Sequence, residues 1–256
     1  MWGQGITYNQ ISNKLNKLGI PPSRGKVGEF TPQKVWSSYT KIKKNLNRED
    51  IYHPPDIEGY FGFNVIEGAG KTIFAYNLTK YLNEHNINAI NISIDGFHYN
   101  KTHRYKKGRD SYRGYYEDAY NEKDFVDKVL ISSQSKIPHY VKSIHNLETD
   151  EYLNLKPEEI ENKTVLITDG AYLFKPIFLK HWDYKIYLKT DFNTAMLRGI
   201  ERDKNLLDNK ENAKEKYFKR YHKASLFYNN KCQPESNANL VIDNTEFDNL
   251  IIQSKD

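Results

Sequence analysis

The short segment Glu67-Gly68-Ala69-Gly70-Lys71-Thr72 contains the residue types that bind nucleotide phosphates. It matches the second half of the pattern G-x-x-x-x-G-K-[ST], in which successive backbone N–H groups surround the phosphates. Lys71 would reach the outer phosphates, and the Thr72 hydroxyl would hold Mg²⁺. We therefore predict that Gly68 to Thr72 bind ATP, with an accidental strand-to-helix turn as the alternative.

Val65 stands where this pattern has its first glycine. A β-branched residue is strained if its position needs a positive φ, and Val65 would also crowd the base of the loop. The donors nearest the β-phosphate come from Gly68 to Thr72, which are intact. We expect weakened ATP binding, not lost binding.

A second candidate is Asp95, which follows the apolar segment Ile92-Ser93-Ile94 and precedes Gly96-Phe97-His98. We expect this carboxylate at the end of the strand next to the phosphate-loop strand, close to a bound γ-phosphate. A base that accepts a hydroxyl proton must stand there. The alternative is a simple turn, because Asp-Gly is a strong turn dipeptide.

Three further residues suit phosphoryl transfer. Asp169 ends the apolar segment Leu166-Ile167-Thr168, as an acid that holds Mg²⁺ directly or through water does. Arg198 and Arg202 are four residues apart and share a helix face, and guanidinium groups neutralise the charge that develops on a transferring phosphoryl group. Salt bridges on the helix surface are the alternative for either arginine.

Strands alternating with helices must position these residues. Helices are expected over Thr72–Tyr81, Phe125–Ile131 and Phe192–Arg202. Candidate strands cover 60–65, 88–94, 139–141, 164–168, 185–188 and 239–242, the last of these being the final strand. This alternation predicts a parallel α/β sheet, whose ligands bind at the carboxyl ends of the strands.

The order of these clusters resembles the uridine kinase/phosphoribulokinase family of P-loop kinases over about residues 57–252. The segments Arg104 to Asn121, Arg220-Tyr221 and Val241 to Asn244 are also similar to it. The resemblance implies a three-layer α/β fold with a mostly parallel sheet, and ATP and Mg²⁺ as cofactors. It implies transfer of the γ-phosphoryl group to a hydroxyl of a small metabolite. The acceptor that it favours is a nucleoside such as uridine. Pantothenate or a sugar alcohol remains an open alternative.

On matching positions the resemblance implies a complete set of site residues. These are catalytic Asp95, Lys71, Arg198 and Arg202; ATP-binding Gly68, Ala69, Gly70, Lys71 and Thr72; acceptor-side His98, Arg104, Tyr116 and Asp118; and metal-binding Thr72 and Asp169. Tyr115-Tyr116-Glu117 stands where uridine kinases tend to have Asp-His-Pro, a departure that bears on uridine as the acceptor.

The N-terminal fifth of the chain carries its excess positive charge. Residues 1–50 hold nine Lys and Arg against three Asp and Glu, a net charge of +6, whereas the whole chain has +5. A helix over Ile6–Leu18 and a second from Thr31-Pro32 are expected, joined by a basic turn. We predict a helix-turn-helix-like segment at 1–52 and a kinase-like domain at 57–256, with His53-Pro54-Pro55-Asp56 as the linker.

This N-terminal segment resembles the helical recombinase domain of serine recombinases. The resemblance implies weak DNA contact through phosphate groups. It also leaves open an alternative function, a nucleotide-binding, DNA-associated regulatory protein with weak or no kinase activity. A lysine-rich solvated face is the simpler interpretation of the charge.

Composition narrows the class of protein. A hydrophobic fraction of 38% with 28% charged residues is typical of a soluble globular protein. No window approaches the roughly 18 apolar residues of a membrane span, and no signal peptide is recognisable. The single Cys232 excludes an internal disulfide and a cysteine-based zinc site. We expect a cytoplasmic protein with no membrane partner.

Overall fold

The computed structural model describes residues 7–20, 26–35, 37, 59–65, 68–203, 214–246 and 250–254. The chain divides into two compact units, Met1–Pro55 and Asp56–Asp256. The predicted linker His53-Pro54-Pro55-Asp56 lies outside the described residues.

The N-terminal unit contains the expected first helix, α1, at Tyr8–Lys17. Thr7 and Gln10 form a capping box, in which the Thr7 hydroxyl accepts from the Gln10 N–H at 3.3 Å and the Gln10 side chain accepts from the Thr7 N–H at 2.8 Å. Both groups would otherwise lack partners at the start of the helix, so the cap fixes where α1 begins.

A second helical turn follows from Pro32 to Val35, and the Thr31 hydroxyl accepts from the N–H of Lys34 at 3.2 Å. The Asn16 side chain connects α1 to this part of the chain through two hydrogen bonds with the Phe30 backbone, at 2.9 and 2.8 Å. The continuation predicted through Trp36 and Tyr39 lies outside the described residues.

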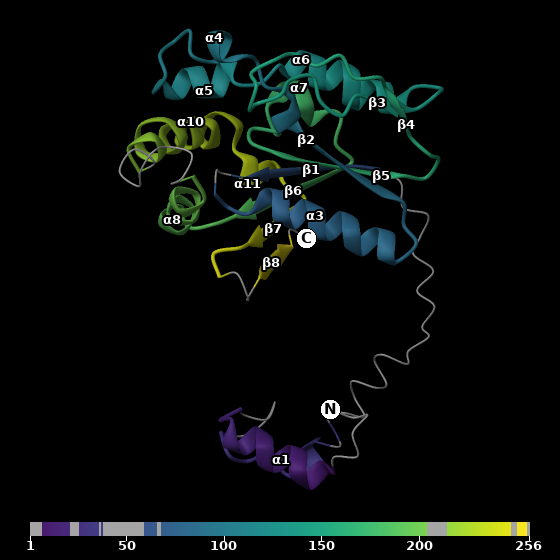
Figure 1. Cartoon of the computed structure of the whole chain (residues 1–256), viewed down its shortest axis with the longest axis vertical. Helices are drawn as coiled ribbons and strands as arrows, with labels where there is room; N and C mark the ends of the chain where they lie inside the picture. Colours follow the sequence, from purple (N-terminus) through teal and green to yellow (C-terminus); the bar gives the residue numbers. More distant parts are fainter. Residues whose placement is uncertain are drawn as a thin grey trace. The chain divides into compact units, whose positions relative to one another are not determined.

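The described part of the larger unit contains a six-stranded sheet in the order β2-β5-β1-β6-β7-β8 (Figure 1). Neighbouring strands are parallel except for the antiparallel pair β7–β8. The strands are β1 (Gly59–Val65), β2 (Ala89–Ser93), β5 (Val165–Gly170), β6 (Tyr184–Lys189), β7 (Leu240–Asp243) and β8 (Ile251–Ser254). The prediction of a mostly parallel α/β sheet is confirmed.

Two details of the predicted sheet are wrong. β5 lies between β1 and β2, so Asp95 follows a strand that is not adjacent to the phosphate-loop strand. The segment 239–242 is not the final strand either, because β8 pairs with β7 in antiparallel fashion. Four residues of an edge strand give too short a pattern to distinguish from a loop.

Helices, turns and a small second sheet complete the larger unit. The helices are α3 (Lys71–Glu84), α4 (Lys101–Arg104), α5 (Tyr112–Asp118), α6 (Glu122–Phe125), α7 (Pro176–Leu179), α8 (Phe192–Asp203), α10 (Lys223–Cys232) and α11 (Pro234–Asn237). The π-helical segments are Val126–Ile131 and Tyr217–His222, and the 3₁₀ turns are Ile94–Phe97 and Ser132–Gln134. β3 (His139–Tyr140) and β4 (Glu158–Glu159) form an antiparallel pair.

The core is divided by the sheet into two sides. Val165 and Ile167 of β5 pack with Ala75 of α3 on one side. Leu166, between them in sequence, packs on the other side in a larger cluster rich in aromatic residues. Because successive strand residues point to opposite faces, β5 is buried on both, as its apolar sequence predicts. Helix, sheet and helix thus form three layers.

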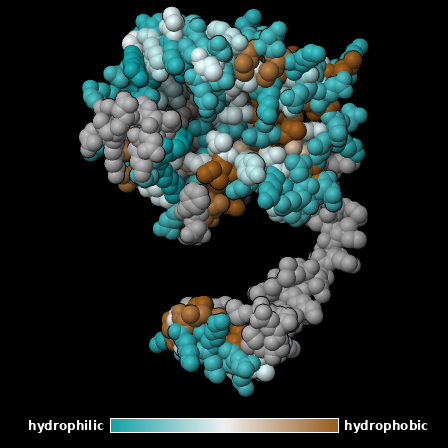
Figure 2. Space-filling model, in the orientation of Figure 1, coloured by the Kyte–Doolittle hydropathy of each residue, from teal (hydrophilic) through white to brown (hydrophobic). Residues whose placement is uncertain are grey.

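The chain passes from β1 into α3 at one end of the sheet, on the left in Figure 1, where α4, α5, α8 and α10 also lie. The carboxyl ends of the parallel strands meet there. At the lower edge, exposed Leu250, Ile251 and Ile252 contribute to a hydrophobic region around β8 (Figure 2). Within the described ranges, none of the helices combines the length and hydropathy needed to cross a bilayer.

Candidate active site

The phosphate-binding loop begins where β1 ends. Val65 is the last residue of β1 and pairs with Leu188 of β6, so its backbone is extended. The positive φ angles lie further on, at Gly68 (85°) and Gly70 (88°). The position of Val65 therefore needs no left-handed backbone, and the strain expected for a β-branched residue there has no basis in this geometry.

Gly68 and Gly70 are required by close packing as well as by φ. A Cβ on Gly68 would lie 2.0 Å from the backbone oxygen of Ala195 in α8. Gly70 is the N-cap of α3, and the Asn244 side chain donates to the Ala69 backbone oxygen at 2.8 Å. α8 and the segment after β7 thus hold the loop from two sides.

A cavity of about 520 Å³ opens above this loop; we call it the phosphate cavity. Its lining comprises Gly68, Gly70, Lys71, Thr72, Ile73, Arg198, Gly199 and Arg202. The free N–H groups and dipole at the start of α3 favour an anion there. Lys71 is only 5% exposed, which is rare for lysine, and it brings a cation to the same place. This lining fits the phosphates of ATP.

Asp169, at the end of β5, is fully buried next to the start of α3. Its carboxylate accepts hydrogen bonds from the Thr72 hydroxyl at 3.0 Å and from the Asn91 amide at 3.2 Å, and the Ser93 hydroxyl lies 3.4 Å away. Burial raises the pKa of Asp169, and the charge of nearby Asp95 adds to this shift, while Lys71 and the hydrogen bonds oppose it.

Mg²⁺ fits the pair of Thr72 and Asp169. The Thr72 hydroxyl gives its hydrogen to Asp169, so its lone pairs stay available to a cation. In the part of the chain that the structure describes, no group of three or more His, Cys, Asp or Glu could hold a metal ion. Mg²⁺ commonly needs one or two protein oxygens and takes the rest from water and substrate phosphates.

Asp95 lies in the 3₁₀ turn after β2. The Tyr120 hydroxyl donates to its Oδ1 at 3.1 Å, and the His98 Nδ1–H donates to its backbone oxygen at 2.7 Å. The His98 and Tyr120 rings pack with centroids 4.4 Å apart. The hydrogen bonds around Asp95 therefore fix the carboxylate on one side.

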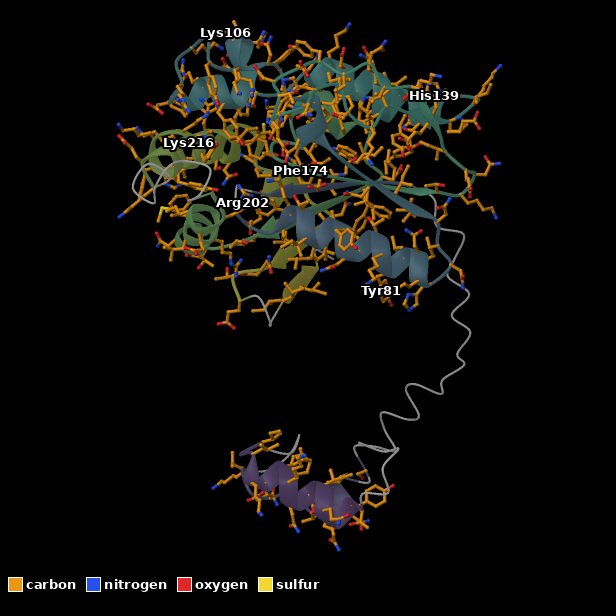
Figure 3. The ribbon with its side chains drawn as sticks, in the orientation of Figure 1. Tyr81, Lys106, His139, Phe174, Arg202 and Lys216 are labelled. Atoms are coloured by element: carbon orange, nitrogen blue, oxygen red, sulfur yellow. The ribbon has the colours of Figure 1, made fainter. Side chains whose placement is uncertain are left out.

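A second cavity, of about 200 Å³, lies at Asp95; we call it the acceptor cavity. It is lined by Asp95, His98, Arg104, Tyr105, Tyr115, Ala119, Tyr120, Leu147, Arg202, Arg220 and Tyr221. Arg202 lines both this cavity and the phosphate cavity. Its position on α8 is labelled in Figure 3. Arg202 thus lies between the phosphate cavity and the acceptor cavity, which contains the Asp95 carboxylate.

The predicted arginines have different surroundings. The Arg198 guanidinium donates to the backbone oxygens of Asn244 and Thr245, both at 2.9 Å, so it is held at the edge of the phosphate cavity. Arg202 donates to the Tyr217 hydroxyl at 3.3 Å. These hydrogen bonds hold both guanidinium groups beside the cavities.

On the acceptor side, the structure brings His98 and Arg104 to the cavity and places Tyr116 elsewhere. Tyr116 is 5% exposed and packs on Phe227, and its hydroxyl lies 3.5 Å from the Cys232 sulfur. Adjacent residues of a helix point in different directions, so Tyr115 lines the cavity while Tyr116 enters the core.

Asp118 is not among the residues that line the acceptor cavity. Its two carboxylate oxygens each lie 2.9 Å from a lysine amine, of Lys106 and of Lys107. Burial favours the neutral carboxyl, but these lysines outweigh it and lower the pKa of Asp118. The pairs connect the segment after α4 to α5, which agrees with a shaping role for Asp118.

Several site residues escaped prediction from the sequence. Tyr120 lines the acceptor cavity, while Asn91 and Ser93 surround Asp169. The alternation Asn91-Ile92-Ser93 was a usable signal, since residues two apart on a strand share a face. Tyr120 had no such signal, because its contact with Asp95 depends on how α5 packs.

Comparison with known proteins agrees with this geometry. Residues 64–245 match the model of the Phosphoribulokinase / Uridine kinase family. No curated protein matches the chain. The match covers the end of β1, the strands β2, β5, β6 and β7, both cavities and α8, and it does not extend to β8 or to the N-terminal unit.

Solved structures are similar in fold at low identity. One is described as a "Possible Uridine Kinase" from Bacillus stearothermophilus, with 17% identity, a TM-score of 0.56 and coverage of 79% of this chain and 98% of that one. Another is a "putative fructose transport system kinase" from Silicibacter sp. TM1040, with 17% identity, a TM-score of 0.57 and coverage of 75% and 93%.

A phosphoribulokinase from Rhodobacter spheroides is also similar, with 11% identity, a TM-score of 0.51 and coverage of 77% of this chain and 81% of that one. These three likenesses are those of an α/β P-loop kinase fold. The predicted fold class is confirmed.

Proposed function

The chain belongs to the phosphoribulokinase/uridine kinase family, and from that premise we propose that it transfers the γ-phosphoryl group of ATP to a hydroxyl of a small metabolite. The observation that carries this proposal is the meeting of two cavities at Arg202, with Lys71 and Thr72 in one and Asp95 in the other. A kinase needs a phosphate site and a base on either side of the transferring group.

On the phosphate side, the backbone of Gly68 to Thr72 binds the β- and γ-phosphates, and Lys71 neutralises their outer oxygens. Thr72 and Asp169 would hold Mg²⁺, which would supply positive charge that neutralises phosphate oxygens. Arg198 is already held at the cavity edge by two backbone oxygens, so it needs little ordering when the nucleotide binds.

On the acceptor side, Asp95 is the base. The acceptor oxygen forms a bond to the γ-phosphorus, the bond to the β–γ bridging oxygen breaks, and ADP leaves. The hydroxyl proton passes to Asp95, whose Oδ1 accepts from Tyr120 and whose Oδ2 is therefore the oxygen we assign to the proton. Arg202, which lines both cavities, neutralises charge on the equatorial oxygens.

A nucleoside is the acceptor class proposed from the sequence. Aromatic side chains of Tyr105, Tyr115 and Tyr221 line the acceptor cavity, and such rings suit stacking with a planar base. A sugar is the competing neutral acceptor, because one protein of similar fold is described as a fructose transport system kinase.

The test is acceptor-dependent release of ADP, measured with a panel of nucleosides and sugars. Lys71→Ala should lower the rate at least ~100-fold, since it removes a cation from the phosphates, with little change in folding. Lys80→Ala is the control, because Lys80 is an exposed lysine of the same helix. Full turnover by Lys71→Ala would show that the loop assignment is wrong.

The N-terminal unit supports a second candidate function, contact with DNA phosphates. Lys14 and Lys17 lie in the last turn of α1, within a segment of net charge +6. A salt titration of duplex binding by the full chain, compared with Lys14→Glu/Lys17→Glu, tests it. Duplex binding that weakens as salt rises, and that is weaker in the double variant, supports this candidate function. Absence of duplex binding at low salt would contradict it.

A further inference from the structure

Of the described charged groups in the wall of the acceptor cavity, Arg220 is the most buried. It lies in the π-helical segment Tyr217–His222 and is 2% exposed. Its guanidinium carbon lies 5.0 Å from the ring centroids of both Tyr105 and Tyr115. Its Nη1 donates to the backbone oxygen of Arg109. The side chain is thus held in one orientation by two rings and a carbonyl.

Among the residues that the structure describes, no carboxylate lies within 4 Å of the Arg220 guanidinium. Arg104, in the same cavity, differs in this respect because it pairs with Asp150 at 3.3 Å. A buried charge without an ionic partner is costly, and stacking on two tyrosines offsets only part of that cost. The cavity wall therefore contains a preorganised cation to which the described part of the chain brings no counter-charge.

The charge balance of the whole lining points the same way. The acceptor cavity has guanidinium groups from Arg104, Arg202 and Arg220, and among the lining residues that the structure describes Asp95 is the one carboxylate. Asp150 compensates Arg104, and Arg202 also faces the phosphate cavity. Arg220 is left for the acceptor itself. A guanidinium fork matches the paired oxygens of a phosphate or a carboxylate.

We propose that Arg220 binds an anionic group of the acceptor, so that the substrate is a hydroxyl compound carrying a phosphate or a carboxylate. This inference rests on the proposed kinase function and narrows its acceptor class. A neutral nucleoside or sugar would fill the cavity and bring no negative charge to Arg220. Arg104 and Arg202 add to the positive potential that attracts the anion.

A purely architectural role for Arg220 is the competing explanation, because its contact with Arg109 joins two segments. Arg220→Gln separates the two roles: glutamine keeps an N–H donor for the Arg109 oxygen and removes the charge. The control is Arg113→Gln, which removes an exposed arginine from α5 that is not part of the cavity lining.

The first experiment measures binding of inorganic phosphate while a saturating non-hydrolysable ATP analogue with Mg²⁺ occupies the phosphate cavity. The wild type and Arg113→Gln should bind phosphate with equal affinity, and Arg220→Gln should lose at least ~10-fold. Equal binding by all three proteins, or no binding by the wild type, would overturn the proposal. If Arg220→Gln does not fold, phosphate inhibition of the wild type decides: it must compete with the acceptor and not with ATP.

The second experiment compares acceptors: a sugar phosphate, a hydroxy acid, a nucleoside and a neutral sugar. We expect ADP release with one of the two anionic classes, which identifies phosphate or carboxylate, and a KM for it at least ~10-fold higher in Arg220→Gln with kcat within ~3-fold. Efficient turnover of a neutral acceptor, unchanged by Arg220→Gln, would contradict the proposal. Absence of turnover with every acceptor would instead contradict the kinase function, while phosphate binding still tests Arg220.

Discussion

The two cavities of this protein are built in different ways. The phosphate cavity is made largely by one continuous segment, Gly68 to Ile73, with α8 closing it. The acceptor cavity is made by side chains from the turn after β2, from α4, from α5, from the segment at Leu147 and from residues 220–221. A short sequence pattern can specify the first kind of site, whereas tertiary packing must assemble the second.

Two carboxylates near the cavities, Asp169 and Asp95, differ in burial. Asp169 is fully buried, accepts hydrogen bonds from Thr72 and Asn91, and is suited to hold a cation in a fixed place. Asp95 lines an open cavity and is held at Oδ1 by Tyr120. An oxygen that must receive a proton from a substrate needs that openness.

The largest expected effect comes from adding a methyl group to the phosphate loop. In Gly68→Ala the new Cβ meets the Ala195 oxygen at 2.0 Å, at a φ of 85°. We expect loss of ATP binding and roughly 2–4 kcal/mol of destabilisation in urea unfolding. Gly108→Ala is the control, because Gly108 has φ 97° with nothing within 4 Å of a Cβ, so strain alone remains. Equal destabilisation of both variants would show that α8 does not close on the loop.

A second prediction separates function from stability at Asp169. Its pKa is raised by burial, so the folded protein holds this proton more tightly than the unfolded chain. Its contribution to stability is therefore full below the unfolded value of about 3.9 and is lost as pH rises through the folded pKa. At pH 7 the ionised carboxylate lowers stability.

Asp169→Asn should therefore raise the melting temperature at pH 7 while weakening Mg²⁺-dependent activity by roughly 10- to 100-fold. The gain in melting temperature over the wild type should shrink as pH falls toward 4. Melting curves from pH 4 to 8 and Mg²⁺ titrations check both parts. A lower melting temperature at pH 7 would contradict the stability argument.

A smaller effect is expected from the acceptor side. Tyr120→Phe removes the hydroxyl that holds Asp95 and should lower kcat by about 3- to 10-fold, the equivalent of one hydrogen bond. The KM for ATP should stay unchanged, because Tyr120 does not line the phosphate cavity. Tyr81→Phe, an exposed tyrosine of α3, serves as control. If only the KM for ATP rose, the assignment of Tyr120 to the acceptor cavity would be wrong.

The smallest effect is expected at Val65, although the sequence pattern makes it look most damaging. Its backbone is extended in β1, so a glycine gains no conformational freedom that the loop requires. We expect Val65→Gly to change kcat/KM for ATP by less than ~3-fold and to cost about 0.5–1 kcal/mol in stability. A tenfold gain in activity would restore the view that Val65 impairs the loop.

The sequence predicted the fold and located the residues of the phosphate cavity because their signals are local. In the segment Gly68 to Thr72 and in the apolar run that ends at Asp169, the order of residue types alone predicts the local backbone structure. The order of the strands could not be predicted in the same way. β5 lies between β1 and β2 in the sheet, and no local pattern in these strands indicates that arrangement.

The acceptor side was predicted only in part for the same physical reason. Asp95, His98 and Arg104 were named from motifs, but the choice of Tyr116 over Tyr115 needed the orientation of α5. The position of the Arg220 guanidinium between the rings of Tyr105 and Tyr115 could not be seen from the sequence, since it depends on how three separate segments pack.

The most direct test of the division between the two cavities is Asp95→Asn, followed by both ATP affinity and acceptor-dependent ADP release. If Asp95 is the base, kcat falls at least ~100-fold while the Kd for ATP stays within ~2-fold of the wild type. An unchanged acceptor-dependent rate, or a loss of ATP binding as large as the loss of rate, would contradict it.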